Sequence, residues 1–231
     1  MVAAALVGSL AVESADRFSD LDVTLGIADQ VQVSNVLDDW TGTLSEEDDA
    51  VALVDLERGP TIYRVFLLPD ALQLDLSMTP AALFRPTGPR FRLLFGETAG
   101  REPEPVAGTL FIPTPAAPED VFGWGVIYAL HARACIERGR LWQAEHYVGA
   151  VRDHALALAC LREGVTATQA RGYDDLSAQA LRPFEDAHVG AVEPEARRKA
   201  LTVSVRALLT EGEEARLQNA HVVGDRLAEV I

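Results

Sequence analysis

The sequence predicts an α+β protein, in which a small mixed β-sheet with helices is followed by a helical bundle. Residues 1–97 alternate short β-type runs with little helical pattern, whereas the apolar residues beyond residue 118 recur at helical spacing. Between them, residues 98–118 are rich in proline, glycine, alanine and glutamate, a composition that sustains neither a helix nor an interior strand. We therefore expect one domain over 1–97, a linker over 98–118 and a helical domain over 119–231.

The first part of the chain contains six runs that predict β-strands. They cover residues 2–7, 23–27, 51–56, 61–68, 72–77 and 91–95, with glycine- or proline-containing breaks between several of them. Apolar residues within 29–40 predict one helix after the second strand. Ser45, followed by three acidic residues, is interpreted as the start of another helix, with a solvated loop as the alternative.

The second part is predicted to be entirely helical. The expected helices cover residues 119–138, 140–163, 177–188, 194–210 and 213–230. In the second of these, the apolar residues Ala144, Val148, Val151, Ala155 and Leu158 recur at alternating spacings of four and three, which is typical of a helix in a bundle. Tyr173, Asp174 and Asp175 are expected in a loop, either as a helix-capping turn or as a grip for a sugar or an amine.

Charge and composition exclude several classes of function. The net charge of −15 argues against non-specific nucleic-acid binding and suits a cationic small substrate. Cys135 and Cys160 lack metal-type spacing, so we expect them to be buried free thiols in a reducing compartment. No segment reaches the length of a membrane span, and we expect a cytoplasmic protein. No Walker-type loop, Gly-x-Ser-x-Gly elbow or Cys-x-x-Cys pair is present.

The stretch around the first two strands carries the predicted chemistry. Asp20 and Asp22 are two residues apart at the start of a strand, so their side chains point to the same face. Adjacent carboxylates repel each other unless a cation lies between them, and Mg²⁺ takes a few carboxylates together with substrate phosphates. Gly8 allows a ligand close to the backbone, and Ser9 offers a hydroxyl and an amide to a phosphate oxygen.

Gly8-Ser9, ten intervening residues and Asp20-Leu21-Asp22 resemble the first motif of the nucleotidyltransferase superfamily, in particular its aminoglycoside and lincosamide nucleotidyltransferases. The resemblance implies a nucleotidyltransferase-like sheet domain and a third carboxylate on a later strand, for which Asp75 is the candidate. The implied metal ligands are Asp20, Asp22 and Asp75, and Gly8, Ser9 and Ser19 are the expected nucleotide-binding residues.

The implied reaction is Mg²⁺-dependent transfer of a nucleoside monophosphate, here AMP from ATP, to a hydroxyl of a small molecule such as an aminoglycoside- or lincosamide-like antibiotic. By similarity, the general base is Asp75 or a glutamate of the helical domain, for which Glu145 is the candidate. The alternative for Glu145 is a structural ion pair with Arg152, seven residues along the same helix. Relatives often build their sites at dimer contacts, so a homodimer is expected too.

A second hypothesis places the chain in a different class. The same fold without turnover would make a binding or regulatory protein, acting as an antitoxin-like partner. Loss of metal binding and transfer after Asp20→Asn and Asp22→Asn would support the enzyme, whereas unchanged behaviour would support the interaction protein.

Overall fold

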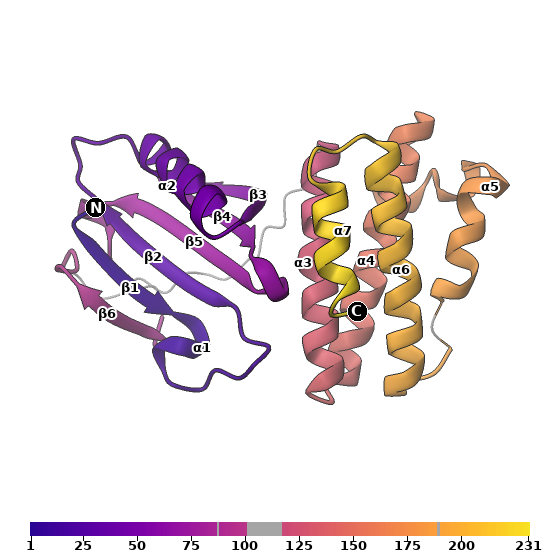
Figure 1. The fold of residues 1–231 in the computed structure, drawn as a ribbon, viewed down its shortest axis with the longest axis horizontal. Helices are drawn as coiled ribbons and strands as arrows, with labels where there is room; N and C mark the ends of the chain where they lie inside the picture. Colours follow the sequence, from indigo (N-terminus) through magenta and orange to yellow (C-terminus); the bar gives the residue numbers. More distant parts are fainter. Residues whose placement is uncertain (87, 101–116, 189) are drawn as a thin grey trace. The chain divides into compact units, whose positions relative to one another are not determined.

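The computed structural model describes residues 1–86, 88–100, 117–188 and 190–231, and divides the chain into two compact units, Met1–Thr114 and Pro115–Ile231. Most of the predicted linker, residues 101–116, lies outside the described residues. The first unit contains the strands and the second contains only helices, which confirms the predicted α+β class (Figure 1).

The first unit is built on one six-stranded mixed sheet with the strand order β3-β4-β5-β2-β1-β6. The strands are β1 (Ala3–Val7), β2 (Leu21–Ile27), β3 (Val51–Arg58), β4 (Thr61–Leu67), β5 (Gln73–Pro80) and β6 (Phe91–Phe95). The pairing of β2 with β5 is parallel, whereas β1–β2, β1–β6, β3–β4 and β4–β5 are antiparallel. The two central strands are therefore brought together from positions about fifty residues apart in the chain.

The two faces of this sheet differ in chemistry. One face packs against helix α2 (Val33–Glu47), with Leu25, Ile27, Leu76 and Met78 fully buried beneath it (Figure 1). Because side chains alternate along a strand, the residues between these apolar positions point to the opposite face. That face carries Asp22 and Thr24 of β2 together with Asp75, Ser77 and Thr79 of β5.

A short segment after β5 packs on this second face. It begins with the 3₁₀ turn Ala81–Leu83, and the next residue, Phe84, is buried against Ala3, Ala5 and Phe91. Asp29 Oδ1 accepts a hydrogen bond of 3.2 Å from the backbone N–H of Ala82 and fixes the segment to the end of β2. Residues 81–85 consequently lie over part of the sheet, beside its polar strip.

The boundaries of two predicted elements in this unit were wrong. The helix expected at 29–40 is α2, which begins four residues later and continues to Glu47, so Ser45 lies near the end of a helix rather than at its start. Burial explains the shift, because Val33 and Leu37 are buried in the sheet core, with Trp40 and Leu44 packed against it. The Gly8–Ser9 turn is also regular, since these residues begin a one-turn helix, α1 (Gly8–Ala11).

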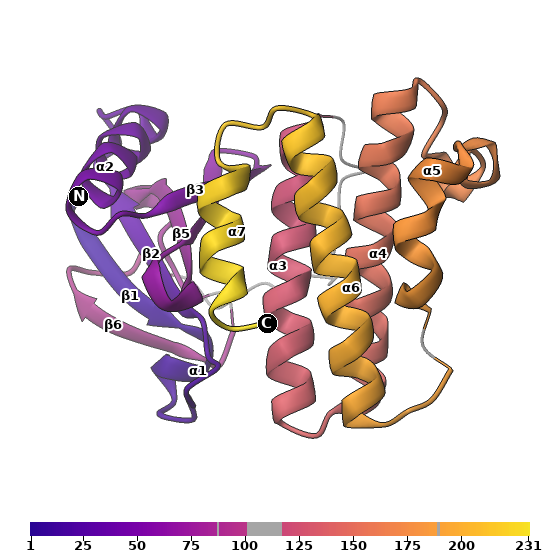
Figure 2. The same cartoon turned by 45° about the vertical axis from the view of Figure 1, so that its right-hand side comes forward.

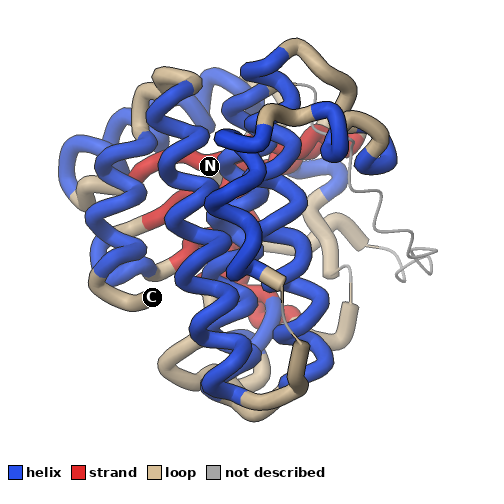
Figure 3. Tube along the Cα trace, turned by 90° about the vertical axis from the view of Figure 1, so that its right-hand side faces the viewer, coloured by secondary structure: helices blue, strands red, loops and turns tan. Residues whose placement is uncertain are grey.

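The second unit is a bundle in which α4 lies against both α3 and α6 (Figures 2 and 3). Its helices are α3 (Pro118–Glu137), α4 (Leu141–Glu163), α5 (Ala178–Leu181), α6 (Pro194–Glu214) and α7 (Ala220–Ala228), with 3₁₀ turns at Thr168–Ala170, Tyr173–Asp175 and Arg182–Ala187. All five residues of the predicted α4 stripe are buried. No described helix is both long enough and apolar enough to span a membrane.

Three details of the bundle differ from the predictions. Helix α6 extends four residues further, because Glu211 and Gly212 are still buried in the core, and α7 begins seven residues later than expected. The helix expected at 177–188 is one turn of α-helix followed by a 3₁₀ segment. Ser177 caps it by accepting a hydrogen bond from the N–H of Ala180, at 3.3 Å. Cys135 and Cys160 are buried and free, as predicted.

Candidate functional site

The sheet unit brings three carboxylates together at one point on its polar face. Asp20 directly precedes β2, Asp22 is its second residue, and Asp75 lies opposite Asp22 in the parallel β2–β5 pairing. Each of the three offers one carboxylate oxygen, and these oxygens all lie within 4.8 Å of one another. The convergence that the sequence predicted is therefore present, and we call these three residues the acidic triad.

Within the described residues, no basic group compensates the negative charges of the triad. Burial, followed by the neighbouring carboxylates of Asp20 and Asp75, together raise the pKa of Asp22 to about 7. Burial also raises the pKa of Asp75 to about 6, with a smaller contribution from Asp20. No cation is among the groups that shift either pKa. The triad is thus a place where a bound cation would remove an unfavourable interaction.

Asp75 is held in place by a neighbour on the same strand. Gln73 Nε2 donates a hydrogen bond of 2.8 Å to Asp75 Oδ1, and this bond opposes the increase in the pKa of Asp75. Gln73 is itself buried. Because the bond occupies one oxygen of the carboxylate, it fixes the orientation of the other.

Gly8 lies directly against the triad. Its φ of +66° is in the left-handed region that glycine adopts without strain, and a Cβ at this position would overlap Oδ2 of Asp22. The next residue, Ser9, has a buried hydroxyl oxygen that finds no hydrogen-bond partner in the described part of the chain. A buried hydroxyl is costly to leave unpaired, so this atom is available to a ligand that reaches the turn.

Ser19 occupies a turn immediately before the triad. The backbone N–H of Asp16 donates to Ser19 Oγ at 2.9 Å, and Ser19 Oγ donates to Asp16 Oδ1 at 3.3 Å. This arrangement fixes the direction in which the chain enters β2. Its predicted role in nucleotide binding stays a prediction, and the observed contacts give it a part in positioning Asp20.

Glu145 lies in the helical unit and forms an ion pair with Arg197 of α6. The guanidinium of Arg197 is fully buried, and burial lowers its pKa. The expected structural pair between Glu145 and Arg152 was wrong, because Arg152 instead pairs with the adjacent Asp153, at 3.0 Å. Arg197 lies on a different helix, so sequence spacing within α4 gave no signal for it. A catalytic role for Glu145 stays a prediction.

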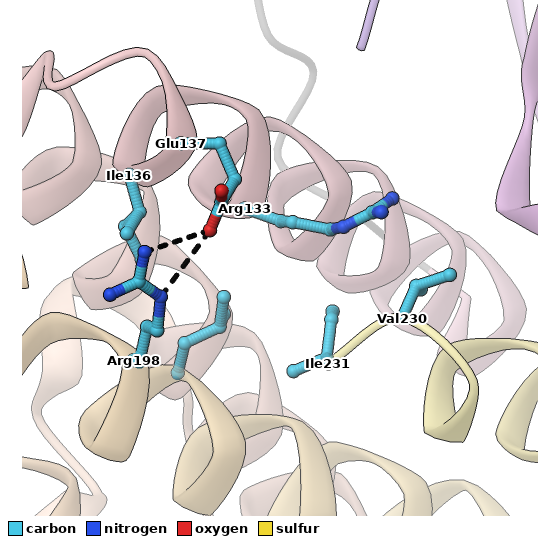
Figure 4. Close-up of a pocket in the computed structure, with 7 residues that line it drawn as sticks. Arg133, Ile136, Glu137, Arg198, Val230 and Ile231 are labelled. Atoms are coloured by element: carbon cyan, nitrogen blue, oxygen red, sulfur yellow. Dashed lines mark hydrogen bonds and ion pairs between the residues drawn. The ribbon is translucent and has the colours of Figure 1, made fainter. Parts of the chain in front are cut away.

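The described residues contain two cavities of note. One, of about 110 Å³, lies on the polar face of the sheet beside the triad. The other, of about 70 Å³, lies in the helical unit between α3, α6 and the last residues of the chain (Figure 4). In its wall Arg198 Nη2 donates a hydrogen bond of 2.9 Å to Glu137 Oε1, so the charges of these two side chains compensate each other.

The sheet cavity was not predicted from the sequence. Its floor contains Thr24 and Ser77, which follow Asp22 and Asp75 by two residues on the paired strands. A hydroxyl residue two positions after each of two aspartates is the signal that could have revealed it, since such residues share a face with the aspartates.

Comparisons with known proteins add one finding. No family model matches the chain, and no curated protein matches it. Among solved structures, the chain is similar to the crystal structure of an aminoglycoside 6-adenyltransferase from Bacillus subtilis, with 15% identity, 99% of this chain and 85% of that chain covered, and a TM-score of 0.36. That enzyme is a nucleotidyltransferase, the class that the motif resemblance named. A likeness this remote does not assign a function to this chain.

Proposed function

We propose that the protein is a nucleotidyltransferase that moves a nucleoside monophosphate, AMP from ATP, to a hydroxyl of a small molecule. The observation that carries this proposal is the acidic triad beside the Gly8–Ser9 turn, with the carboxylate oxygens of Asp20, Asp22 and Asp75 within 4.8 Å of one another. Nucleotidyl transfer needs this combination, because charge develops on the phosphate oxygens and on the leaving group during the reaction.

The donor set of the triad fits a hard divalent cation. Carboxylate oxygens are the protein ligands that Mg²⁺ takes, and the increased pKa values of Asp22 and Asp75 reflect first their burial and then repulsion by neighbouring carboxylates, both of which a bound cation would offset. We propose that Asp20, Asp22 and Asp75 hold Mg²⁺, which when bound neutralises phosphate charge at this point.

The residues of the Gly8–Ser9 turn are proposed to receive the phosphates of the nucleotide. Gly8 has no side chain, so a phosphate can approach the backbone next to Asp22. The buried Ser9 hydroxyl would donate its proton to a phosphate oxygen and gain the hydrogen bond that it lacks. Ser19 would support the site indirectly, through the turn that leads to Asp20.

In the proposed reaction, the acceptor hydroxyl oxygen forms a bond to the α-phosphorus of ATP. The bond from this phosphorus to the oxygen that bridges it to the β-phosphate breaks, and pyrophosphate leaves with the electron pair. The hydroxyl proton passes to Asp75, whose orientation is set by Gln73. We prefer Asp75 to Glu145 as the base because the Glu145 carboxylate is already engaged by Arg197.

Two measurements test this proposal. Calorimetry with Mg²⁺ and a non-hydrolysable ATP analogue should detect binding by the wild type, and Asp20→Asn or Asp22→Asn should abolish it. Asp39→Asn, an exposed aspartate on α2, is the matched control and should leave binding unchanged. Absence of nucleotide binding by the wild type would refute the proposal.

Pyrophosphate release with a panel of hydroxyl acceptors is the second measurement. The transferase proposal predicts release that depends on Mg²⁺ and on Asp75. If nucleotide binds but no acceptor elicits release, the alternative of a non-catalytic binding protein would be favoured.

A further inference from the structure

The cavity on the polar face of the sheet is lined mainly by hydroxyl side chains. Five strand residues contribute them, from three neighbouring strands, and the remaining walls are apolar except for one charged residue. The hydroxyl residues are Thr24, Thr61, Tyr63, Ser77 and Thr79, and the others are Val7, Leu83, Arg85 and Phe91. Thr61 Oγ1 donates to Thr79 Oγ1 at 2.9 Å, so this pair forms one corner of the cavity. Such a surface suits a ligand with several hydroxyl groups.

The cavity adjoins the triad along strands β2 and β5. Thr24 and Ser77 pair with each other in the β2–β5 ladder, two residues along the strands from the Asp22–Asp75 pair. Two residues along a strand span about 7 Å. A molecule in this cavity therefore lies about one sugar-ring width from the carboxylates of Asp22 and Asp75, on the side away from Asp20.

The charge of the cavity is opposite to that of the triad. Arg85 is the charged residue that lines it, and in the described part of the chain no acidic group is paired with this exposed guanidinium. A second cation, Arg58, lies over the ring of Tyr63 with its Cζ 5.8 Å from the ring centroid. The charged side chain in the cavity lining is thus a cation, and a guanidinium is the side chain that best recognises a carboxylate or phosphate.

The size of the cavity limits what it holds. Pockets that enclose drug-sized ligands occupy about 300–1,000 Å³. The volume here is about 110 Å³, which suits a single ring or a short polyol. A molecule of several linked rings would extend far beyond these walls.

We propose that this cavity is the acceptor site and that the acceptor is a monosaccharide-sized polyol that carries a carboxylate or phosphate group. This inference rests on the proposed transferase function. The anionic group pairs with Arg85, the hydroxyl residues of β2, β4 and β5 hold the polyol, and one acceptor hydroxyl points toward Asp75. The net charge of −15 predicted a cationic acceptor, and the local charge of this cavity predicts the reverse.

The position of the cavity distinguishes the acceptor from the phosphate tail of the nucleotide. The Gly8–Ser9 turn lies against Asp22 where α1 begins, and β2 runs from Asp22 toward Thr24 and into the cavity. With the phosphates at that turn, as proposed above, the cavity is left for the other reactant.

A matched set of four sugars tests the proposal without metal or nucleotide. Glucuronate, glucose and glucosamine share one ring and differ in charge, and glucose 6-phosphate separates a phosphate from a carboxylate as the recognised anion. Binding to the full chain would be followed by NMR through the backbone amides of Thr24 and Ser77. We expect at least one of the two anions to bind with the millimolar Kd of a small ligand, at least about tenfold tighter than glucosamine.

Arg85→Gln supplies the test at the level of the residue. Because Arg85 is exposed, the variant should stay folded, and it should weaken binding of the anionic sugar by at least about tenfold. Arg90→Gln, an exposed arginine of the same connection that does not line the cavity, should bind like the wild type. Thr24→Val should weaken all of the sugars equally, because it removes a hydroxyl and no charge.

Three results would overturn the proposal. They are preferential binding of glucosamine, anion binding that is insensitive to Arg85→Gln, and absence of any shift at Thr24 and Ser77. A loss of ATP-analogue binding in Arg85→Gln, with sugar binding unchanged, would assign the residue to the nucleotide and refute the inference as well. Failure of the wild type to bind an ATP analogue with Mg²⁺ would instead refute the transferase reaction, independently of the sugar result.

Discussion

Carboxylates removed from solvent, fully at Glu211 and partly at Asp22 and Asp75, have different partners in the two units of this protein. In the helical unit, Glu211 is buried and accepts two hydrogen bonds from the guanidinium of Arg162, at 2.8 and 3.0 Å. In the sheet unit, Asp22 and Asp75 have no basic partner among the described residues, and the side chains that shift their pKa values are other acids and Gln73. A compensated charge serves the fold, whereas an uncompensated cluster lowers stability and therefore points to a ligand.

The strongest test of this contrast breaks the compensated pair. Glu211→Ala removes two hydrogen bonds and leaves the partly exposed Arg162 with Glu163 alone, at 3.4 Å, and we expect a loss of about 1.5–3 kcal/mol in the free energy of unfolding, measured by urea denaturation. Glu213→Ala, an exposed position two residues along α6, is the control and should change stability by less than about 0.5 kcal/mol. Equal effects of the two substitutions would contradict a structural role for the pair.

Removing one charge from the triad should increase the free energy of unfolding, whereas breaking the Glu211–Arg162 pair should lower it. Asp22→Asn relieves repulsion by Asp20 and Asp75 and removes the cost of burying a charge. In the absence of divalent cations at pH 8, we expect stability to increase by about 1–2 kcal/mol, after discounting the shift for solvent screening. A destabilised variant would show that the Asp22 carboxylate contributes to the fold.

The pH dependence of stability should reveal how much the ionised Asp22 carboxylate destabilises the metal-free protein. The pKa of Asp22 is about 7 in the folded protein and near 3.8 in the unfolded chain. Between these values the folded state holds the proton more tightly, so this group lowers the free energy of unfolding as the pH rises. The stability difference between Asp22→Asn and the metal-free wild type should be absent near pH 3.5 and increase up to about pH 7.5. A difference that is constant with pH would contradict it.

Gly8→Ala should affect the site more than the fold. The added Cβ would overlap Oδ2 of Asp22, which is the end of a side chain that can rotate away. The positive φ costs about 1 kcal/mol for a residue other than glycine. We therefore expect a modest loss of stability and a larger, at least about tenfold, loss of Mg²⁺ affinity, both measurable by calorimetry. Gly59→Ala has a similar φ of +60° with open space around it and should lower stability alone.

Much of the site could be predicted because it depends on strand alternation. Asp20 and Asp22 had to share a face once β2 was recognised, and the apolar residues around Asp75 placed it on a strand too. The parallel register that sets Asp75 opposite Asp22 could not be predicted, since it joins segments far apart in the chain. The placement of Asp75 beside Asp22 was expected from the resemblance to the nucleotidyltransferase motif, because no local pattern indicates it.

The errors have a common physical cause, which is tertiary packing. The acids after Ser45 look like the first turn of a helix, yet Leu44 still packs on the sheet core and α2 continues through Ser45 to Glu47. Arg197 was missed because a charged residue in an amphipathic helix is expected to face solvent, and its acidic partner lies on another helix. Residues 101–116, where the linker was predicted, lie outside the described part of the chain.

The most direct test of the central claim is the thermal stability of the wild type with and without Mg²⁺ at pH 8. If the triad is a cation site, Mg²⁺ should raise Tm by an amount that grows with its concentration, and Asp20→Asn should remove most of this increase. Asp39→Asn should respond to Mg²⁺ as the wild type does. An unchanged Tm of the wild type across Mg²⁺ and Mn²⁺ titrations would contradict the claim that these three carboxylates are held together for a metal ion.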